Sequence, residues 1–452
     1  MRRRFGVVLP ILLLIGAFAA HASAEQTYLL TAPTWGAAQT QAVVAAGGTV
    51  TFSHAETGIG TARSDNPGFL AQVLKSGRIT RGELDATIQW QQPVPYETLD
   101  ATFTNPPNND RFFNTIQWAP QAIDAPGAWA AGCTGEGVRV AVLDGGIWNI
   151  HPDLAPNFDV ARSASFVPGF SFNEDVGTFW HGTHVAGIIA AVDNAGDTNS
   201  GVIGIAPKAT LIGVKVLHDG SGAFAWVIQG ILYAATPTDQ GGAGADIINM
   251  SLGGYWQKAG GHNTLFAALN KAVNYAAGRG VLVVSAAGND SIDLDHVGSV
   301  EFVPAQSGSG VAVSATGPLG FALGATDFQR PASYTNYGTS AINVAAPGGD
   351  FALPGEDPCT VPTTNGASLT RPCWVFDMVM STNVGGWAWA AGTSMAAPAV
   401  SAVAALAKQG HPGISLGDLK TLLQRTAIDE GKPGTDPFYG KGWVNALNAC
   451  VQ

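Results

Sequence analysis

Ser394 is the residue whose type and setting point most directly to chemistry. It lies in the segment 392–398, GTSMAAP, directly before residues 399–407, whose small apolar side chains predict a buried helix. A serine in the first turn of a helix lies beside free backbone N–H groups and the positive end of the helix dipole, which suit a negatively charged oxygen. Serine is also a favoured helix N-cap, so this segment alone leaves a purely structural role equally open.

Asp144 and His181 are the residues that could activate such a serine. Asp144 follows the apolar run 138–143 and precedes two glycines, where a lone aspartate could also cap a turn. His181 opens the segment HGTHVAG, which leads into a second helix of small residues. His184 lies three residues later, but the glutamate and the four-residue spacing of a zinc-protease helix are absent. We therefore interpret His181 as the candidate base and His184 as a packing or hydrogen-bonding residue.

The elements that would position these residues are apolar strands alternating with helices. Their sequences lack a strict polar alternation, which predicts strands buried on both faces, as in a parallel sheet between two helix layers. Such sheets bind ligands at the carboxyl ends of their strands, where Asp144 lies. The predicted strands are 138–143, 211–217, 247–252, 281–286, 311–315 and 342–345.

The N-terminus is typical of a secretory signal peptide, with three arginines, the apolar run 5–20 and the small residues Ala-Ser-Ala before a predicted cut after Ala24. The run contains Pro10 and is short for a membrane span, which needs about 20 residues. We therefore expect a mature protein outside the membrane, exported to the periplasm or the extracellular medium. A net charge of −11, with no later cluster of Lys or Arg, argues against a nucleic-acid partner.

Export would expose the four cysteines to an oxidising compartment. Cys359 and Cys373 both lie beside a proline, which favours a local disulfide in a surface loop and leaves Cys133 to pair with Cys450. Four cysteines nevertheless allow three pairings.

Residues 25–92 predict a small separate α+β unit. Strands are expected at 28–30, 48–52, 57–62 and 84–90, and helices at 39–46 and 69–74. Residues 93–110 are rich in proline and asparagine, which predicts an exposed linker before a second domain at 111–452.

Together the segments VAVLDGGI, HGTHVAG and GTSMAAP resemble the three signatures of the subtilisin-like serine peptidases (subtilases), in that family's order of Asp, His and Ser. The resemblance covers about residue 112 to the C-terminus and implies a three-layer α/β fold with a doubly wound parallel sheet. Residues 25–92 resemble the family's inhibitor-like prodomain, a ferredoxin-like unit that acts as intramolecular chaperone and inhibitor. The linker would then contain the processing site.

The resemblance implies a role for each site residue. Ser394 would be the nucleophile, His181 its base and Asp144 the group that orients the imidazole. Asn289 matches the asparagine that completes the oxyanion hole. The family's substrate-binding walls and the pocket floor, where Phe302 replaces a small residue of many relatives, fall on Ser251, Leu252, Gly253, Ala286, Ala287, Gly288 and Phe302.

The resemblance also implies a structural calcium ion. Asp153 matches a calcium-binding aspartate of the family, and the loop 192–202 is longer than the family's binding loop. The candidate ligands are Asp153, Asp193, Asn194 and Asp197.

The function implied is a secreted serine endopeptidase that acts on polypeptides as a monomer. The alternative is an inactive binding protein that keeps the groove without turnover, and retention of all four site residues favours the enzyme.

Overall fold

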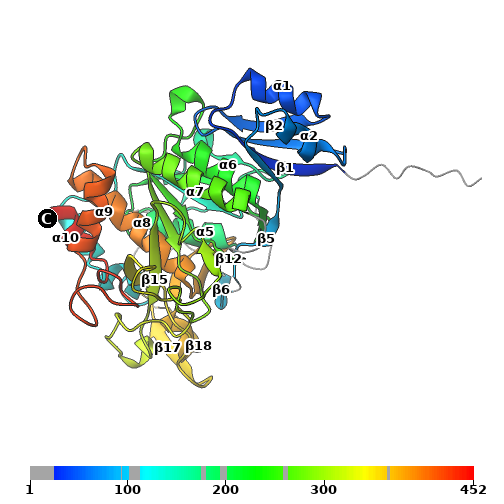
Figure 1. Ribbon diagram of the computed structural model, residues 1–452. Coiled ribbons are helices and arrows are strands. Elements are labelled where there is room, and N and C mark those ends of the chain that lie inside the picture. Colours follow the sequence, from blue (N-terminus) through cyan, green and yellow to red (C-terminus); the bar gives the residue numbers. More distant parts are fainter. Residues whose placement is uncertain are drawn as a thin grey trace, which may run out of the picture.

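The computed structural model describes residues 25–92, 94–100, 112–174, 180–193, 201–257, 263–363 and 367–452. The predicted signal peptide, Asn194 and Asp197 therefore lie outside the described residues. The chain forms a small N-terminal unit and a larger second unit, and Figure 1 shows the former as the blue part on one side of the molecule.

The larger unit is built on a seven-stranded parallel sheet with the strand order β16-β15-β13-β11-β7-β9-β8. From β7 the sheet continues through β11, β13, β15 and β16 on one side and through β9 on the other, which is the doubly wound arrangement predicted; β8, which precedes β9 in the chain, lies outside it. The six predicted strands are confirmed, and the two-residue β8 is additional, too short to give a sequence pattern. The strands are β7 (Arg139–Asp144), β8 (Ala164–Ser165), β9 (Thr210–Lys215), β11 (Ile247–Met250), β13 (Leu282–Ala286), β15 (Val311–Thr316) and β16 (Val344–Pro347).

Helices cover both faces of this sheet, which explains why its strands are mostly apolar and buried (Figure 1). The helices α5 (His181–Ala190) and α8 (Thr393–Gly410) pack together on one face, and α6 (Phe224–Ala235) and α7 (Asn263–Gly278) on the other. Among the described residues, no helix combines the length and apolarity that crossing a membrane requires. The remaining elements of this unit are α3 (Trp118–Ala122), α4 (Ala125–Ala130), α9 (Leu416–Arg425), α10 (Ala446–Val451), β10 (Ser221–Ala223), β12 (Gly254–Gln257), β14 (Val300–Val303), β17 (Pro358–Pro362), β18 (Ser368–Pro372), β19 (Val379–Asn383) and β20 (Gly386–Ala390).

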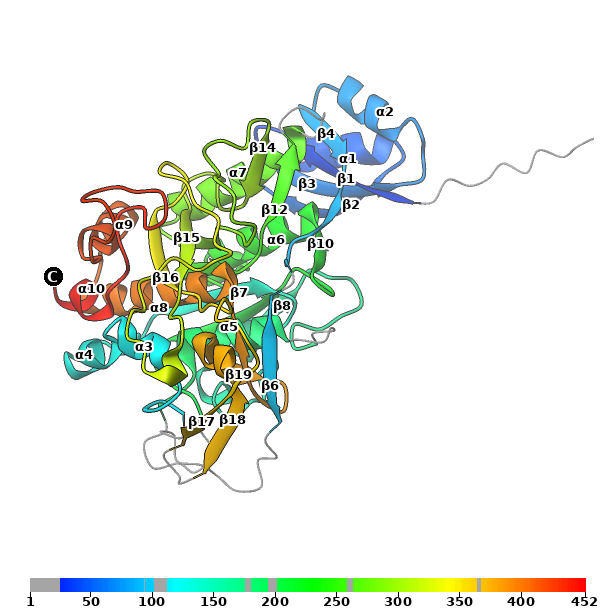
Figure 2. The same cartoon turned by 90° about the horizontal axis from the view of Figure 1, so that it is seen from below.

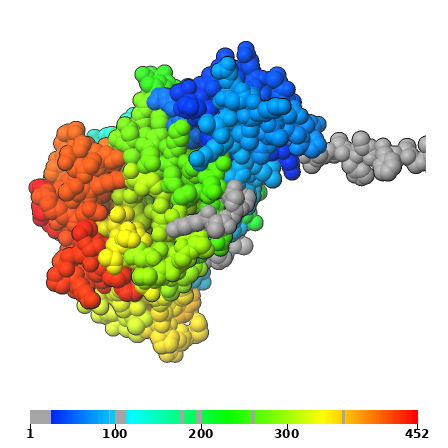
Figure 3. Space-filling view, viewed as in Figure 1, coloured from blue at the N-terminus to red at the C-terminus, as the bar shows by residue number. Residues whose placement is uncertain are grey.

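The N-terminal unit has the element order β-α-β-β-α-β and an antiparallel sheet in the order β2-β3-β1-β4, as in ferredoxin-like folds. Its own core includes Leu30, Val43 and Phe69. The sheet packs against α7, and Figure 3 shows the unit seated on the green surface of the larger one. Its elements are β1 (Gln26–Thr31), α1 (Ala37–Ala45), β2 (Thr49–His54), β3 (Ile59–Ser64), α2 (Phe69–Lys75) and β4 (Arg81–Leu84).

The segment that follows this unit differs from the prediction. The single strand expected at 84–90 divides into β4 and β5 (Thr87–Gln89), and β5 pairs with β10 of the larger unit. Within the expected exposed linker, residues 96–100 form a strand, β6 (Tyr96–Asp100), which pairs with β20 (Figure 2). The sequence suggested exposure because it is rich in proline and polar residues, whereas the strand partner lies almost 300 residues away.

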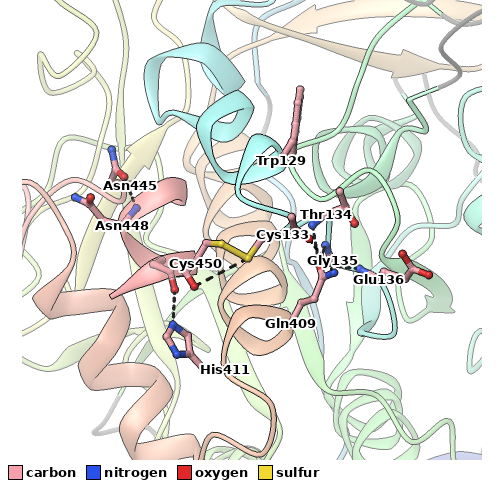
Figure 4. The surroundings of a disulfide bond; sticks show 12 residues. Trp129, Cys133, Thr134, Gly135, Glu136, Gln409, His411, Asn445, Asn448 and Cys450 are labelled. Atoms are coloured by element: carbon pink, nitrogen blue, oxygen red, sulfur yellow. Dashed lines mark hydrogen bonds between the residues drawn. A yellow bond between two sulfur atoms is a disulfide. The ribbon is translucent and has the colours of Figure 1, made fainter.

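Both expected disulfides are present. Cys133–Cys450 joins the segment after α4 to the C-terminal helix α10. Beside it, Oε1 of Gln409 accepts hydrogen bonds from three successive backbone N–H groups, of Thr134, Gly135 and Glu136 (Figure 4). Cys359–Cys373 links the first strand of the hairpin β17–β18 to the residue just after the second.

Candidate active site

Asp144 and His181 meet at the carboxyl end of β7. Nδ1–H of His181 donates to Oδ2 of Asp144 at 2.9 Å, and both side chains are buried. The backbone N–H of Gly145 donates to the other oxygen, Oδ1, at 2.7 Å. The carboxylate therefore fixes the imidazole with Nδ1 protonated, which leaves Nε2 as the nitrogen that can accept a proton.

Gly182 explains how α5 can begin so close to β7. A Cβ at this position would lie 2.2 Å from the carbonyl oxygen of Gly146 and 2.9 Å from Cβ of Asp144. Any other residue would push the start of the helix, and with it His181, away from Asp144. The glycine is required by the distance between the two elements.

Ser394 lies in the first turn of α8 but does not cap it. The N-cap is Gly392, and no side chain makes a capping hydrogen bond there. The hydroxyl of Ser394 lies 3.3 Å from the carbonyl oxygen of Ser251, and the hydroxyl of Ser251 donates to the carbonyl oxygen of Ser394 at 2.7 Å. The capping role that the sequence left open is therefore not what holds this serine.

Asn289 is oriented by a residue that the sequence analysis did not single out, Thr393. Oδ1 of Asn289 accepts from the backbone N–H of Thr393 at 2.9 Å and from its hydroxyl at 2.8 Å. The amide NH₂ therefore points the other way, and a Cβ built on Gly392 would lie 3.5 Å from it. The sequence feature that could have identified Thr393 is its position directly before Ser394 in the GTSMAAP segment.

Phe302 lies between the two walls expected for a substrate pocket. Its ring would be 2.3 Å from a Cβ on Gly253 and 2.8 Å from a Cβ on Gly288, and its side chain is 1% exposed. The pocket lined by Leu252, Ala286 and these residues keeps about 10 Å³ of free space with the N-terminal segment in place, room for one water molecule at most. Ser251 and Ala287 are also buried in these walls.

The N-terminal segment occupies the cleft. Trp90 is buried, its indole N–H donates to the carbonyl oxygen of Gly222 at 2.8 Å, and its carbonyl accepts from Gly253 N at 2.7 Å. Nε2 of Gln91 donates to Oδ1 of Asp144 at 2.6 Å and lies 2.9 Å from Nδ1 of His181.

Gln92 extends this contact past the substrate walls. Its Oε1 accepts from the backbone N–H of Asn289 at 2.8 Å, and its amide donates to Asp290. The sequence offered no signal for either glutamine.

Asp153, the residue expected to bind calcium, has its carboxylate among N–H donors. Its buried carboxylate accepts from the indole N–H of Trp387 at 2.8 Å and from the backbone N–H groups of Gly201 and Val202 at 3.1 and 3.2 Å. Burial raises the pKa of Asp153 to about 7. Among the described residues, no group of three acidic, His or Cys side chains is arranged to hold a metal ion, and calcium binding by Asp153 stays a prediction.

Of the other calcium candidates, Asp193 alone lies in the part of the chain that the structure describes, and the backbone N–H of its neighbour Val192 donates to the carbonyl oxygen of Asp153 at 2.8 Å. Asp193 is exposed, and Asn194 and Asp197 lie outside the described residues. Calcium binding by this loop stays a prediction.

His184 has the structural role expected of it. It is fully buried, its Nε2 hydrogen-bonds the carbonyl oxygen of Ala388 at 3.0 Å, and burial lowers its pKa to about 3. It is therefore a neutral imidazole that ties α5 to β20.

A serine, a histidine and an aspartate at the carboxyl edge of a doubly wound sheet define a class of protein, the serine hydrolases. The sequence model of the Subtilase family matches residues 135–442. Subtilisin Savinase from Lederbergia lenta is 36% identical over 333 residues, which are 74% of this chain and 97% of Savinase. Thermitase from Thermoactinomyces vulgaris is 35% identical over 347 residues, 75% of this chain and 98% of thermitase.

Among solved structures, the epidermin leader peptide processing serine protease (EpiP) from Staphylococcus aureus is similar with a TM-score of 0.74. The match covers 95% of this chain and 98% of EpiP at 23% identity, so it concerns the fold alone. The chain belongs to the subtilase family of serine proteases.

Proposed function

We propose that this chain is an exported endopeptidase that cleaves polypeptides with Ser394, His181 and Asp144 and is made as a precursor that processes itself. The observation that carries the proposal is the course of residues 87–92, which run through the cleft with hydrogen bonds to both walls and reach Asp144. A segment of the chain thus lies where a peptide substrate would lie. The two disulfides fit export to an oxidising compartment.

The chemistry follows from the groups at the site. Nε2 of His181 takes the hydroxyl proton of Ser394 as the oxygen bonds to the carbonyl carbon of the substrate. Asp144 stabilises the imidazolium that forms. The negative oxygen of the tetrahedral intermediate accepts hydrogen bonds from the amide of Asn289 and the backbone N–H of Ser394. His181 then gives its proton to the leaving amine, the bond to nitrogen breaks, and water releases the acyl group by the same route.

Residues 25–92 would act as the intramolecular chaperone and inhibitor. Most of the parallel sheet's pairings join residues far apart in the sequence, which makes unassisted folding slow. The N-terminal unit packs on α7 and binds the cleft, so it stabilises the folded state in which α7 and the cleft are both in place.

The test is the Ser394→Ala variant, produced in a host free of other proteases. It should accumulate as a folded precursor, whereas wild type yields a chain that begins within or after the cleft segment. Appearance of the mature species from Ser394→Ala would show that another protease matures the protein. Labelling of mature wild type by an organophosphate tests the nucleophile itself. An inactive binding protein finds no support among the relatives, several of which are named as proteases.

A further inference from the structure

The strand β20 ends four residues before Ser394 and would be an edge strand without β6. β19 pairs with one side of β20, and β6 pairs with the other from Tyr96↔Ala390 to Asp100↔Gly386. The contact continues beyond the strands, because Ala391 N–H donates to the carbonyl oxygen of Pro95 at 3.2 Å. The pairing along the edge of β20 therefore continues to Ala391, three residues before Ser394.

The chain segment in the cleft is held on both sides of Ser394. Upstream, β5 pairs with β10, and the side chain of Gln92 bonds Asp290. Downstream, Val94 touches the segment of Ser394, since a Cβ on Gly392 would lie 2.9 Å from Cγ1 of Val94. Gln92 therefore contacts the site on the upstream side and Val94 on the downstream side, and β6 lies where the part of a substrate beyond the cut bond would have to go.

One ion pair marks this downstream side. Nε of Arg371 lies 3.1 Å from Oε1 of Glu97, and the two side chains are 27% and 41% exposed. Arg371 lies in β18, opposite Cys359 of β17, and the disulfide Cys359–Cys373 closes this hairpin. The disulfide stiffens the hairpin that carries Arg371, and Arg371 contacts Glu97, which lies opposite Trp389 of β20.

We propose that the edge of β20 binds the downstream part of a polypeptide substrate as an added antiparallel strand, and that Arg371 selects an acidic side chain at the position of Glu97, five residues after Gln92. The proposal rests on the proposed endopeptidase function. Backbone hydrogen bonds to a sheet edge bind any sequence, and side-chain contacts beside it give selectivity. An exposed ion pair of this kind corresponds to about a twofold to fivefold preference.

The test uses enzyme whose chain begins after β6, so that the edge of β20 is open, and three fluorogenic peptides: residues 85–100 of this chain, the same peptide with Glu97→Lys, and a short peptide that ends at Pro95. We expect the long peptide to be cleaved with about tenfold higher kcat/KM than the short one, because a few net hydrogen bonds are added. The Glu97→Lys peptide should be twofold to fivefold worse than the long parent peptide. The enzyme variant Arg371→Glu should reverse this order, and Arg371→Gln should abolish it.

Lys432→Glu makes the same charge change in a different exposed loop and is the matched control. It should keep the wild-type order of the peptides, which separates a local contact from the effect of net charge. Casein hydrolysis reports folding of each variant.

Equal rates on the long and short peptides would overturn strand binding at β20. A preference for Glu97 that survives Arg371→Glu would overturn the role of Arg371. If wild type cleaves neither casein nor any peptide, the proposed endopeptidase function is refuted as well, so the two failures can be told apart.

Discussion

Truncation of Trp90 tests whether the N-terminal unit inhibits through its tail. The side chain is 1% exposed, its ring centroid lies 4.8 Å from that of Phe224, and its N–H bonds Gly222. Replacing a buried tryptophan by alanine typically costs about 3–5 kcal/mol. With about 3 kcal/mol lost, the isolated segment 25–92 carrying Trp90→Ala should inhibit the mature enzyme about 150-fold more weakly.

The assay is the inhibition constant of this segment against cleavage of a chromogenic peptide. Thr87→Ala is the matched control, because Thr87 is exposed in the same segment and pairs with Ala223 through the backbone. It should leave the inhibition constant nearly unchanged. An increase in the inhibition constant of less than about fivefold for Trp90→Ala would refute the reasoning. If the tail docks in this way, removal of so well buried a side chain must weaken binding by more than that.

Three further predictions concern the pocket, the docked unit and the loop after α5. Phe302→Gly should extend cleavage toward peptides with aromatic residues before the cut bond, and equal wild-type rates on Phe and Ala peptides would contradict a filled pocket. Burial raises the pKa of Asp85, whose carboxylate accepts from the backbone N–H of Ala225, to about 6. Docking of segment 25–92 to the mature enzyme should therefore be strongest below about pH 4 and weaken up to about pH 6, on the order of 100-fold, and Asp85→Asn should remove most of this dependence. The N–H donors around Asp153 predict that EDTA lowers the Tm less than Trp387→Phe does, and a larger effect of EDTA would show that a cation replaces the indole N–H.

The sequence predicted best what depends on neighbours in the chain. Asp144 and Ser394 were found because each lies in a short segment whose residues also set the local backbone, a strand end for one and a helix start for the other. Phe302 needed the family resemblance as well, because nothing beside it in the sequence indicates Gly253 and Gly288.

Contacts between distant segments could not be predicted in this way. Gln91 reaches Asp144 only because β5 is anchored on β10, and this pairing has no sequence pattern. For Asp153 the sequence identified the carboxylate but not the indole N–H of Trp387 that donates to it, because Trp387 lies more than 200 residues away.

The position of β6 gives the linker a physical role that its composition did not suggest. After a cut between Gln92 and Val94, the upstream part keeps its contacts through Trp90 and the whole N-terminal unit, whereas the downstream part is held by the β20 pairing and the Glu97–Arg371 contact. The upstream product can therefore leave as a separate chain, whereas the downstream part stays attached as the N-terminus of the catalytic chain and covers the other half of the cleft. We therefore expect full activity to require a second cut after β6, as a step of maturation beyond the loss of the inhibitory unit.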